Sequence, residues 1–370
     1  AQHPNTTFPW ATVEPISAEV SFFHKNRLPY AEHYDFSLQR QIGASTVVSA
    51  SYVGTQAHRL VSFLESNPAN AGLCLSLDPD NPNNVLSANS PSACGPFGEN
   101  APIGAPFVTR SGQRIPTTRT VLAPAFGSNP YEIDAASSNY NSLQLSVRHS
   151  TKSVEFLIGY TFSKCLDNSS GLQETTNPFN PRLSRGLCIF DVTHNFVASY
   201  TIQLPLDKVA GESRVAKAAL GGWAFSGITT FATGLPIVLM EDDDQSLSGT
   251  NADVPNVVPG KLLANTNPRN GGTYFNTNLF SPEALGQLGN SARRFFHGPG
   301  LNNFDMALLK GFKFTESKEL QLRVEAFNVF NHAQFDNPSG TLNAGGNPLF
   351  GVVTAANNAR ILQVACKILF

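Results

Sequence analysis

The feature that most limits the fold of this chain is a two-residue alternation of apolar and polar side chains that recurs in nine segments. Successive side chains of a β-strand face opposite sides, so a period of two indicates a strand with one apolar and one polar face. In the C-terminal segment every second residue is apolar, and the chain stops on Phe370. We predict strands at 34–42, 46–54, 140–149, 154–163, 195–204, 223–233, 304–314, 320–330 and 362–370.

The connections between these strands alternate between short and long. Brief or moderate turns at 43–45, 150–153, 205–222 and 315–318 follow every odd-numbered strand, and long polar stretches follow the others. Outer-membrane barrels have short periplasmic turns and long extracellular loops. The alternative, a soluble β-sandwich, gives no reason for such a segregation of loop length. We therefore predict an all-β antiparallel meander that forms part of a transmembrane β-barrel.

The composition agrees with this fold class. Only 14% of the residues are charged, against about a quarter in soluble domains, and the net charge of −2 gives no reason to expect a nucleic-acid partner. No run of 18 apolar residues exists, which excludes a transmembrane helix. A membrane β-strand needs only about ten alternating residues, so the low hydropathy is compatible with a membrane protein.

Four charged residues fall on the polar face of the last three predicted strands: Asp305, Arg323, Glu325 and Lys367. In a barrel this face lines the lumen. Opposite charges on neighbouring strands attract, so these side chains either form a luminal ion-pair ladder or are solvated one by one.

Five cysteines need a place in the fold. Cys74 and Cys94 lie in one long polar stretch, and Cys165 and Cys188 flank another. Two loop disulfides fit an oxidising periplasm or cell surface, and four unpaired cysteines are the alternative. Cys366 falls on the apolar face of the last strand, where it acts as a small hydrophobic residue.

We find no motif for catalysis or for a bound cofactor. The eight histidines are scattered, with no pair at the spacing of metal ligands, and no nucleotide-binding loop or nucleophile elbow appears. The one compact acidic cluster runs from Glu241 to Asp244. It either binds calcium through carboxylate oxygens, with Asp242, Asp243 and Asp244 as candidate ligands, or is a hydrated surface loop.

Several segments resemble, in the same order, the C-terminal barrel of TonB-dependent outer-membrane receptors, particularly the Oar-like group. They run from residue 31 to the end of the chain. The matching segments are Tyr34-Asp-Phe-Ser-Leu-Gln-Arg-Gln, Ser51-Tyr-Val-Gly54, Asn139-Tyr-Asn-Ser-Leu-Gln144, Tyr160-Thr-Phe-Ser-Lys164, Asp191-Val-Thr-His-Asn-Phe196, Gly221-Gly-Trp223, Arg323-Val-Glu-Ala-Phe-Asn-Val-Phe-Asn-His332 and Phe370.

The resemblance implies a receptor that takes up a solute and is not an enzyme. It implies outer-membrane lipid around the barrel and a TonB energy-coupling partner. It also implies that the barrel-assembly machinery recognises the C-terminal strand, here through Phe370, Ile368 and Val364. The family's signal peptide, plug and N-terminal strands are not recognisable. We expect residues 1–30 to be the tail of an extracellular loop and 31–370 to be the C-terminal part of a barrel.

Two other functions stay open at this point. One is a cell-surface adhesion or structural β-protein without transport. The other is a small self-contained pore, although bacterial single-chain barrels have an even number of strands.

Overall fold

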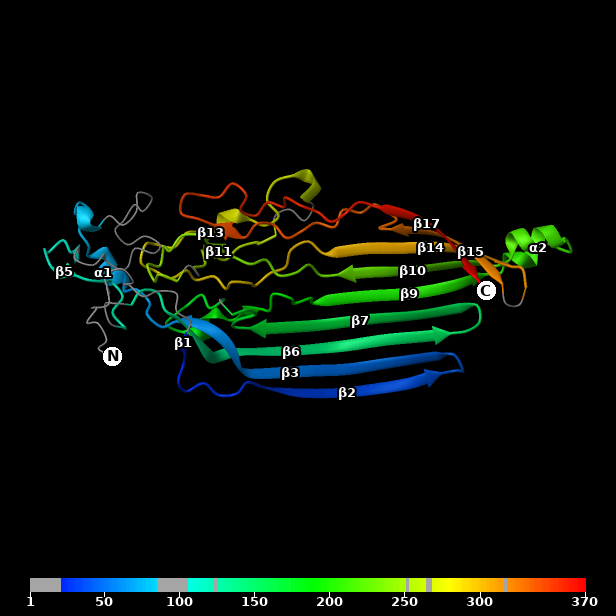
Figure 1. Ribbon diagram of the computed structural model, residues 1–370, viewed down its shortest axis with the longest axis horizontal. Helices are drawn as coiled ribbons and strands as arrows, with labels where there is room; N and C mark the ends of the chain where they lie inside the picture. Colours follow the sequence, from blue (N-terminus) through cyan, green and yellow to red (C-terminus); the bar gives the residue numbers. More distant parts are fainter. Residues whose placement is uncertain are drawn as a thin grey trace, which may run out of the picture.

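A computed structural model describes residues 21–84, 106–122, 126–172, 174–209, 211–250, 253–263, 268–315 and 318–370. Nine long strands form one antiparallel sheet in which each strand pairs with its neighbours along the chain, as the sequence predicts (Figure 1). The strands are β2 (Tyr30–Ile42), β3 (Thr46–Glu65), β6 (Pro130–Ser150), β7 (Val154–Asp167), β9 (His194–Leu204), β10 (Trp223–Ala232), β14 (Leu301–Lys313), β15 (Glu319–Phe327) and β17 (Ile361–Leu369).

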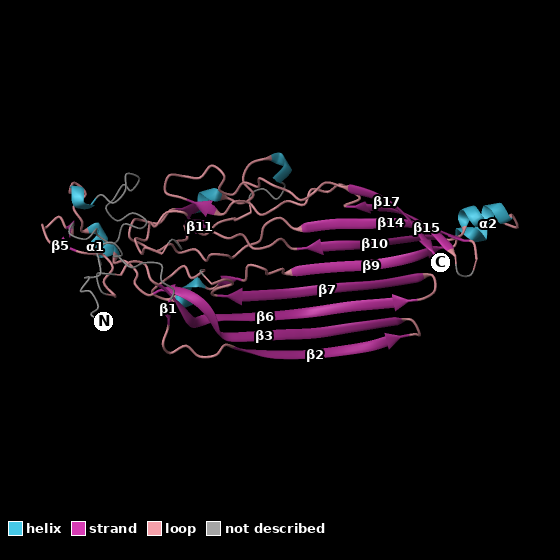
Figure 2. Ribbon diagram, viewed as in Figure 1, coloured by secondary structure: helices cyan, strands magenta, loops and turns pink. Residues whose placement is uncertain are grey.

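The other elements are short and lie in the connections or at strand ends (Figure 2). β1 pairs with β6 in parallel, and β8 pairs with β7. The two α-helices are α1 (Ala71–Leu75) and α2 (Arg214–Leu220). The short strands are β1 (Ser21–Phe22), β4 (Phe107–Val108), β5 (Arg114–Ile115), β8 (Gly186–Leu187), β11 (Met240–Glu241), β12 (Asn256–Val257), β13 (Phe280–Ser281) and β16 (Thr341–Leu342). The 3-10 turns are η2 (Pro82–Asn84), η3 (Pro181–Ser184), η4 (Leu206–Val209), η5 (Pro268–Asn270) and η6 (Thr277–Leu279).

Short and long connections lie at opposite ends of the sheet. Figure 1 shows the turns after β2, β6 and β14 and the helix α2 at one end, and the long connections gathered at the other. An antiparallel meander produces this segregation whenever every second connection is a tight turn. The prediction made from connection length is confirmed.

The register puts the apolar residues of all nine strands on one face. Phe36 pairs with Tyr52, Tyr52 with Leu143, and Leu143 with Phe162, which makes a row across four strands. The side chains of this face are exposed, including those of Phe36, Leu38, Ile42, Tyr52, Leu143, Leu145, Phe162, Phe231, Leu308, Leu322, Val324, Leu362, Val364 and Ile368. A face of this extent is unfavourable in water and is stable against lipid.

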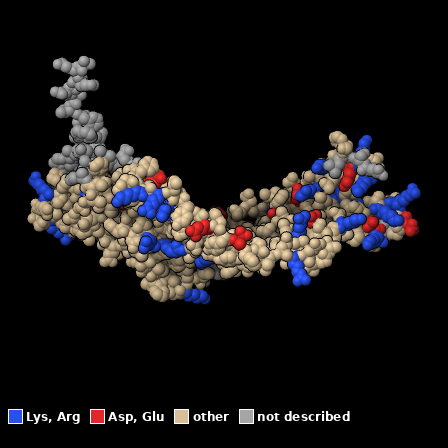
Figure 3. Space-filling model, turned by 90° about the horizontal axis from the view of Figure 1, so that it is seen from below, with Lys and Arg blue, Asp and Glu red and all other residues tan. Residues whose placement is uncertain are grey.

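Polar residues make the matching rows on the other face. The Ser37 and Ser51 hydroxyls hydrogen-bond across β2 and β3 at 2.9 Å, and those of Ser49 and Ser146 across β3 and β6 at 2.7 Å. Seen edge-on, the molecule is a shallow trough (Figure 3). Within the described residues the sheet is open, because β2 and β17 each have a strand neighbour on one side only.

Two strands are much longer than the alternation predicts. β3 has 20 residues and β6 has 21, and their pairing shifts register between Ala57 and Ser62. Arg59 adopts a positive φ of 56° at this bulge. A bulge breaks the period of two, which is why the sequence pattern ends before the strand does.

The long connections pack together into what we call the loop layer: the described parts of 66–129, 168–193, 233–300 and 328–360. It contains two apolar clusters. The larger one centres on the fully buried Phe275, against which Phe280, Phe296 and Phe350 pack edge-on or tilted. The smaller one contains Cys74, Leu77, Phe107, Ile115 and Leu247. The loops therefore have cores of their own.

Candidate functional site

The first candidate site is a hollow at the short-turn end of the polar face. It has a volume of about 1110 Å³ and lies between α2 and the polar faces of β9, β10, β14 and β15. Its lining mixes polar and apolar residues and carries three cationic side chains and one carboxylate. Thr201, Gln203, Ser226, Gln321, Leu309, Phe312, Lys217, Lys313, Arg323 and Glu319 are among the residues. An apolar outer face with a wet, charged inner face is the arrangement of a barrel wall.

The structure places the predicted luminal charges on this polar face. Arg323 and Glu325 form an ion pair of 2.7 Å along β15. Lys367 lies beside Gln321 in the register of β15 and β17. Asp305 has a local role, because its carboxylate accepts the N–H of Asn328 at 2.8 Å, where the chain leaves β15 with a positive φ of 51°.

Helix α2 is held against the sheet by Lys310, a residue that the sequence patterns do not single out. The Lys310 ammonium donates to the carbonyl of Ala218 at 2.8 Å and to that of Gly221. It also lies over the rings of Trp223 and Phe312, 5.5 and 4.7 Å from their centres. A cation at the C-terminus of a helix satisfies carbonyls that have no partner within the helix.

The base of the loop layer is tied to β7 by a disulfide. Cys165, near the end of β7, is bonded to Cys188, and its N–H donates to the Asp191 carboxylate at 2.6 Å. The other oxygen of Asp191 lies 2.9 Å from Nε2 of His297. Cys74 is also disulfide-bonded, whereas Cys94 lies outside the described residues. Cys366 is a free, exposed cysteine on the apolar face.

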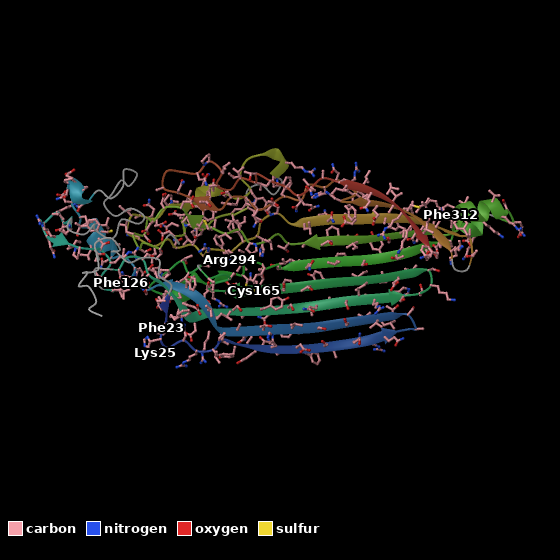
Figure 4. All side chains as sticks on the ribbon, viewed as in Figure 1. Phe23, Lys25, Phe126, Cys165, Arg294 and Phe312 are labelled. Atoms are coloured by element: carbon pink, nitrogen blue, oxygen red, sulfur yellow. A yellow bond between two sulfur atoms is a disulfide. The ribbon has the colours of Figure 1, made fainter. Side chains whose placement is uncertain are left out.

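Arg294 forms a second tie beside the disulfide (Figure 4). The residue is 3% exposed. Its guanidinium donates to the carbonyl of Leu187 at 2.6 Å and to the Ser170 hydroxyl at 2.9 Å. The same group lies 3.0 Å from Glu174 and 3.3 Å from Asp167. One cation thus joins two long connections, 168–193 and 233–300.

The electrostatics of Glu174 reflect this contact. Burial alone would raise the pKa of the carboxyl, but the Arg294 guanidinium and the Ser170 N–H outweigh it and lower the pKa below its usual 4.5. Glu174 is therefore ionised in the folded loop layer, as an ion pair requires.

The acidic cluster of the sequence does not act as one group. Asp242 is exposed, Asp243 accepts the N–H of Ala344 at 2.7 Å, and Asp244 accepts those of Ser248 and Gly249 at 3.0 and 2.7 Å. Among the described residues, no group of three or more His, Cys, Asp or Glu side chains is arranged so that it could hold a metal ion.

Three carboxylates of the same region are buried: Glu241 belongs to the acidic run, whereas Asp253 and Glu283 were missed by sequence reasoning. Glu241, Asp253 and Glu283 are 2%, 2% and 4% exposed. Burial and the neighbouring carboxyls raise the pKa of Glu241 to about 9; burial, with the nearby Asp244 and Glu283, raises that of Asp253 to about 7. These residues stand 12 and 30 positions apart in the chain, so no local motif unites them.

The predicted assembly signal lies at the edge strand. In β17, Ile368 and Val364 pair with Leu320 and Val324 and share the apolar face with them. Phe370 follows the strand and is 96% exposed. No helix in the described part of the chain is long and apolar enough to cross a membrane.

The fold and these surfaces define a class: the wall of a membrane-spanning antiparallel β-barrel, with an apolar outer face, a polar inner face and a structured layer of long loops. The family described as "Outer membrane beta barrel domain" matches residues 2–363, and the chain belongs to that family. It is a protein of the outer membrane.

Three similar solved structures belong to much longer proteins. The outer membrane transporter YddB from Escherichia coli is 10% identical with a TM-score of 0.46, over 95% of this chain and 34% of that one. The pyoverdine outer membrane receptor FpvA from Pseudomonas aeruginosa PAO1 is 8% identical with a TM-score of 0.42, over 92% and 30%. The FrpB iron transporter from Neisseria meningitidis is 9% identical with a TM-score of 0.38, over 93% and 32%. The chain spans about a third of the length of these proteins, and the comparison with curated proteins found no match.

Proposed function

We propose that residues 31–370 are the C-terminal part of the barrel of a TonB-dependent receptor of the Oar-like group. In this proposal the full-length receptor takes up a solute of unknown identity through the outer membrane and catalyses no reaction. Residues 1–30 are the tail of an extracellular loop, and a plug domain and further strands complete the protein.

The observation that carries the proposal is the open sheet with a polar, hollowed inner face. A membrane strand leaves its backbone groups without partners unless it belongs to a closed barrel. β2 and β17 each lack a second neighbour among the described strands, so a functional barrel needs more strands than these nine. Plugged transporters have about 22 strands, which leaves room for the missing ones.

The sequence motifs between Tyr34 and Phe370 support the assignment to TonB-dependent receptors, because they follow the family's order along the whole sheet. The hollow beside α2 is lined by polar, charged and apolar residues and lies at the inner face, which suits contact with a plug domain. In the proposal the barrel-assembly machinery recognises Phe370, Ile368 and Val364, and TonB binds a segment that precedes the plug.

The experiment uses the full-length protein purified from outer membranes in detergent. We expect it to bind the immobilised periplasmic domain of TonB, and we expect a variant without the segment before the plug to lose binding. Spent medium is compared by mass spectrometry among wild-type cells, a receptor deletion and a TonB deletion. A solute depleted only by the wild type supports uptake. No TonB binding and identical media would instead support the adhesion or structural protein.

A further inference from the structure

Two adjoining cavities open between the connections 233–300 and 328–360. Their volumes are about 400 and about 330 Å³, and Arg269 and His332 line both of them, so the cavities share one wall. The first cavity also has the rings of Tyr274 and Phe335 in its lining. No carboxylate is found among the described residues that line either cavity. The shared wall is therefore cationic.

The side chains of this wall can act as hydrogen-bond donors. Arg269 is exposed, so its guanidinium can be reached from outside. Asn331, Asn357 and Asn358 line the second cavity and bring amide groups to it. Guanidinium and amide N–H groups are donors suited to the oxygens of a phosphate or carboxylate group.

His332 is held in a fixed position with one nitrogen available. The Asn328 side chain accepts the N–H of His332 at 2.9 Å and donates to its carbonyl at 2.8 Å. The Gln334 amide accepts the N–H of Asn302 at 3.0 Å, which orients its nitrogen toward Nδ1 of His332, 3.4 Å away. Because this nitrogen only donates, Nδ1 accepts and the hydrogen of the neutral imidazole lies on Nε2. Nε2–H is thus a donor for a ligand.

The cavities lie beside the lipid-facing surface, at its outer edge. Phe304 stands near the long-connection end of β14 and shares the apolar face with Leu308. The ring of Phe330 packs edge-on against Phe304, with ring centres 4.9 Å apart, and is 65% exposed. Aromatic girdles mark the two edges of the apolar band of a barrel. His332, two residues beyond Phe330, therefore lies just outside the band, at the level of the lipid headgroups.

A second arginine is fixed at the same edge. The backbone N–H of Arg360 donates to Oδ1 of Asn331 at 2.9 Å, and its guanidinium donates to the carbonyl of Val329 at 3.2 Å. Arg360 is exposed and directly precedes β17. Its charge adds to that of Arg269 beside the exposed ring of Phe330.

We propose that Arg269, His332 and Arg360 bind the phosphate group of a glycolipid in the outer leaflet around the barrel. Arginine binds phosphate oxygens through parallel N–H groups, and a cation next to an aromatic girdle meets headgroups. A free phosphate has the same oxygens. The exposed Phe330 favours the lipid, because the acyl chains of a lipid bound here continue along the apolar face. The inference rests on the outer-membrane position and does not depend on the transport proposal.

The test measures lipid binding to the full-length protein, purified in detergent and stripped of co-purified lipid. The probe is lipid A, a glucosamine disaccharide lipid with two phosphate groups, and its dephosphorylated form is the matched control. Native mass spectrometry over a series of lipid concentrations gives a dissociation constant for each. We expect dephosphorylation to weaken binding about tenfold or more, because charge-assisted hydrogen bonds to phosphate are lost. Equal binding of the two lipids would overturn the proposal.

Matched variants locate the binding. Arg269→Gln should weaken lipid A binding about tenfold, and Arg269→Lys, which keeps the charge, should weaken it less. Arg114→Gln changes an exposed arginine of another long connection and should leave binding unchanged. Heat-modifiable gel mobility shows that each variant is an assembled barrel. The proposal fails if Arg269→Gln and Arg360→Gln both bind lipid A as Arg114→Gln does. Equal affinity for inorganic phosphate and lipid A would identify a site for a free anion and refute the assignment to a lipid.

Discussion

Arg294 offers the sharpest test of how the loop layer is held together. We consider Arg294→Met, which keeps most of the side-chain volume and removes the guanidinium. The change leaves the buried Asp167 and the partly buried Glu174 without their cation, and the carbonyl of Leu187 without its donor. Removing one partner of a buried ion pair costs about 3–5 kcal/mol, whereas an exposed pair contributes about 0–1 kcal/mol. Since Arg294 is 3% exposed, the larger value applies.

The lost free energy destabilises the loops locally, because Arg294 meets the sheet where the sheet joins the loops, at Asp167 of β7 and Leu187 of β8. At about 1.4 kcal/mol per factor of ten, we expect the hydrogen exchange of peptides from 168–193 to accelerate roughly a hundredfold or more. The assay is exchange mass spectrometry of the full-length protein in detergent. Arg182→Met, an exposed arginine in the same connection, is the control and should change exchange little. Equal exchange in both variants would refute the reasoning.

Four further outcomes are expected. The pKa of Glu174 is lowered in the folded protein, so its ionised carboxylate stabilises the loop layer above its usual pKa, and this stabilisation is lost as pH falls through the folded value. Hydrogen exchange of peptides from 168–193 should therefore accelerate on acidification from about pH 7 to about pH 3, and accelerate less in Glu174→Gln. Full-length protein should fractionate with outer membranes and resist high salt, and recovery as a soluble monomer would contradict the lipid-facing surface. Residues 1–370 alone should aggregate in water, because both edge strands expose backbone groups, and a monodisperse, cooperatively unfolding domain would count against this. Phe370→Ala should reduce heat-modifiable, assembled barrel more than Leu369→Ala, and equal yields would remove the assembly assignment.

Much of the sheet could be predicted from the sequence, because a strand with lipid on one side and water on the other must alternate. All nine strands were found, with the correct faces and the correct end for each short turn. The predicted strand bounds are wrong where the strands no longer alternate between an apolar and a polar face. β15 ends at Phe327 and not at residue 330, because Asn328 turns the chain with a positive φ. The distal halves of β3 and β6 lie beyond the region where one face is apolar.

The loop layer could not be predicted in the same way. Its ties join residues far apart in the chain, such as Arg294 and Asp167, which are separated by 127 positions. The residues that surround Arg294 and Asp167 in the sequence have no pattern that distinguishes them from other polar loops. The acidic run at 241–244 drew attention because it is contiguous, whereas the buried Asp253 and Glu283 come from separate segments. Within the run, Glu241 and Asp244 are buried and Asp242 is exposed, a difference that only the folded chain reveals.

The length of β3 and β6 has a consequence for how the protein meets its surroundings. Twenty residues at about 3.3 Å each make a ribbon of roughly 66 Å, which rises roughly 47 Å along the membrane normal at a tilt of about 45°. The apolar band of an outer-membrane barrel is only about 25 Å tall. The ends of β3 and β6 therefore extend roughly 20 Å beyond such a band, and they hold the described parts of the connection 66–129 at that distance from the lipid.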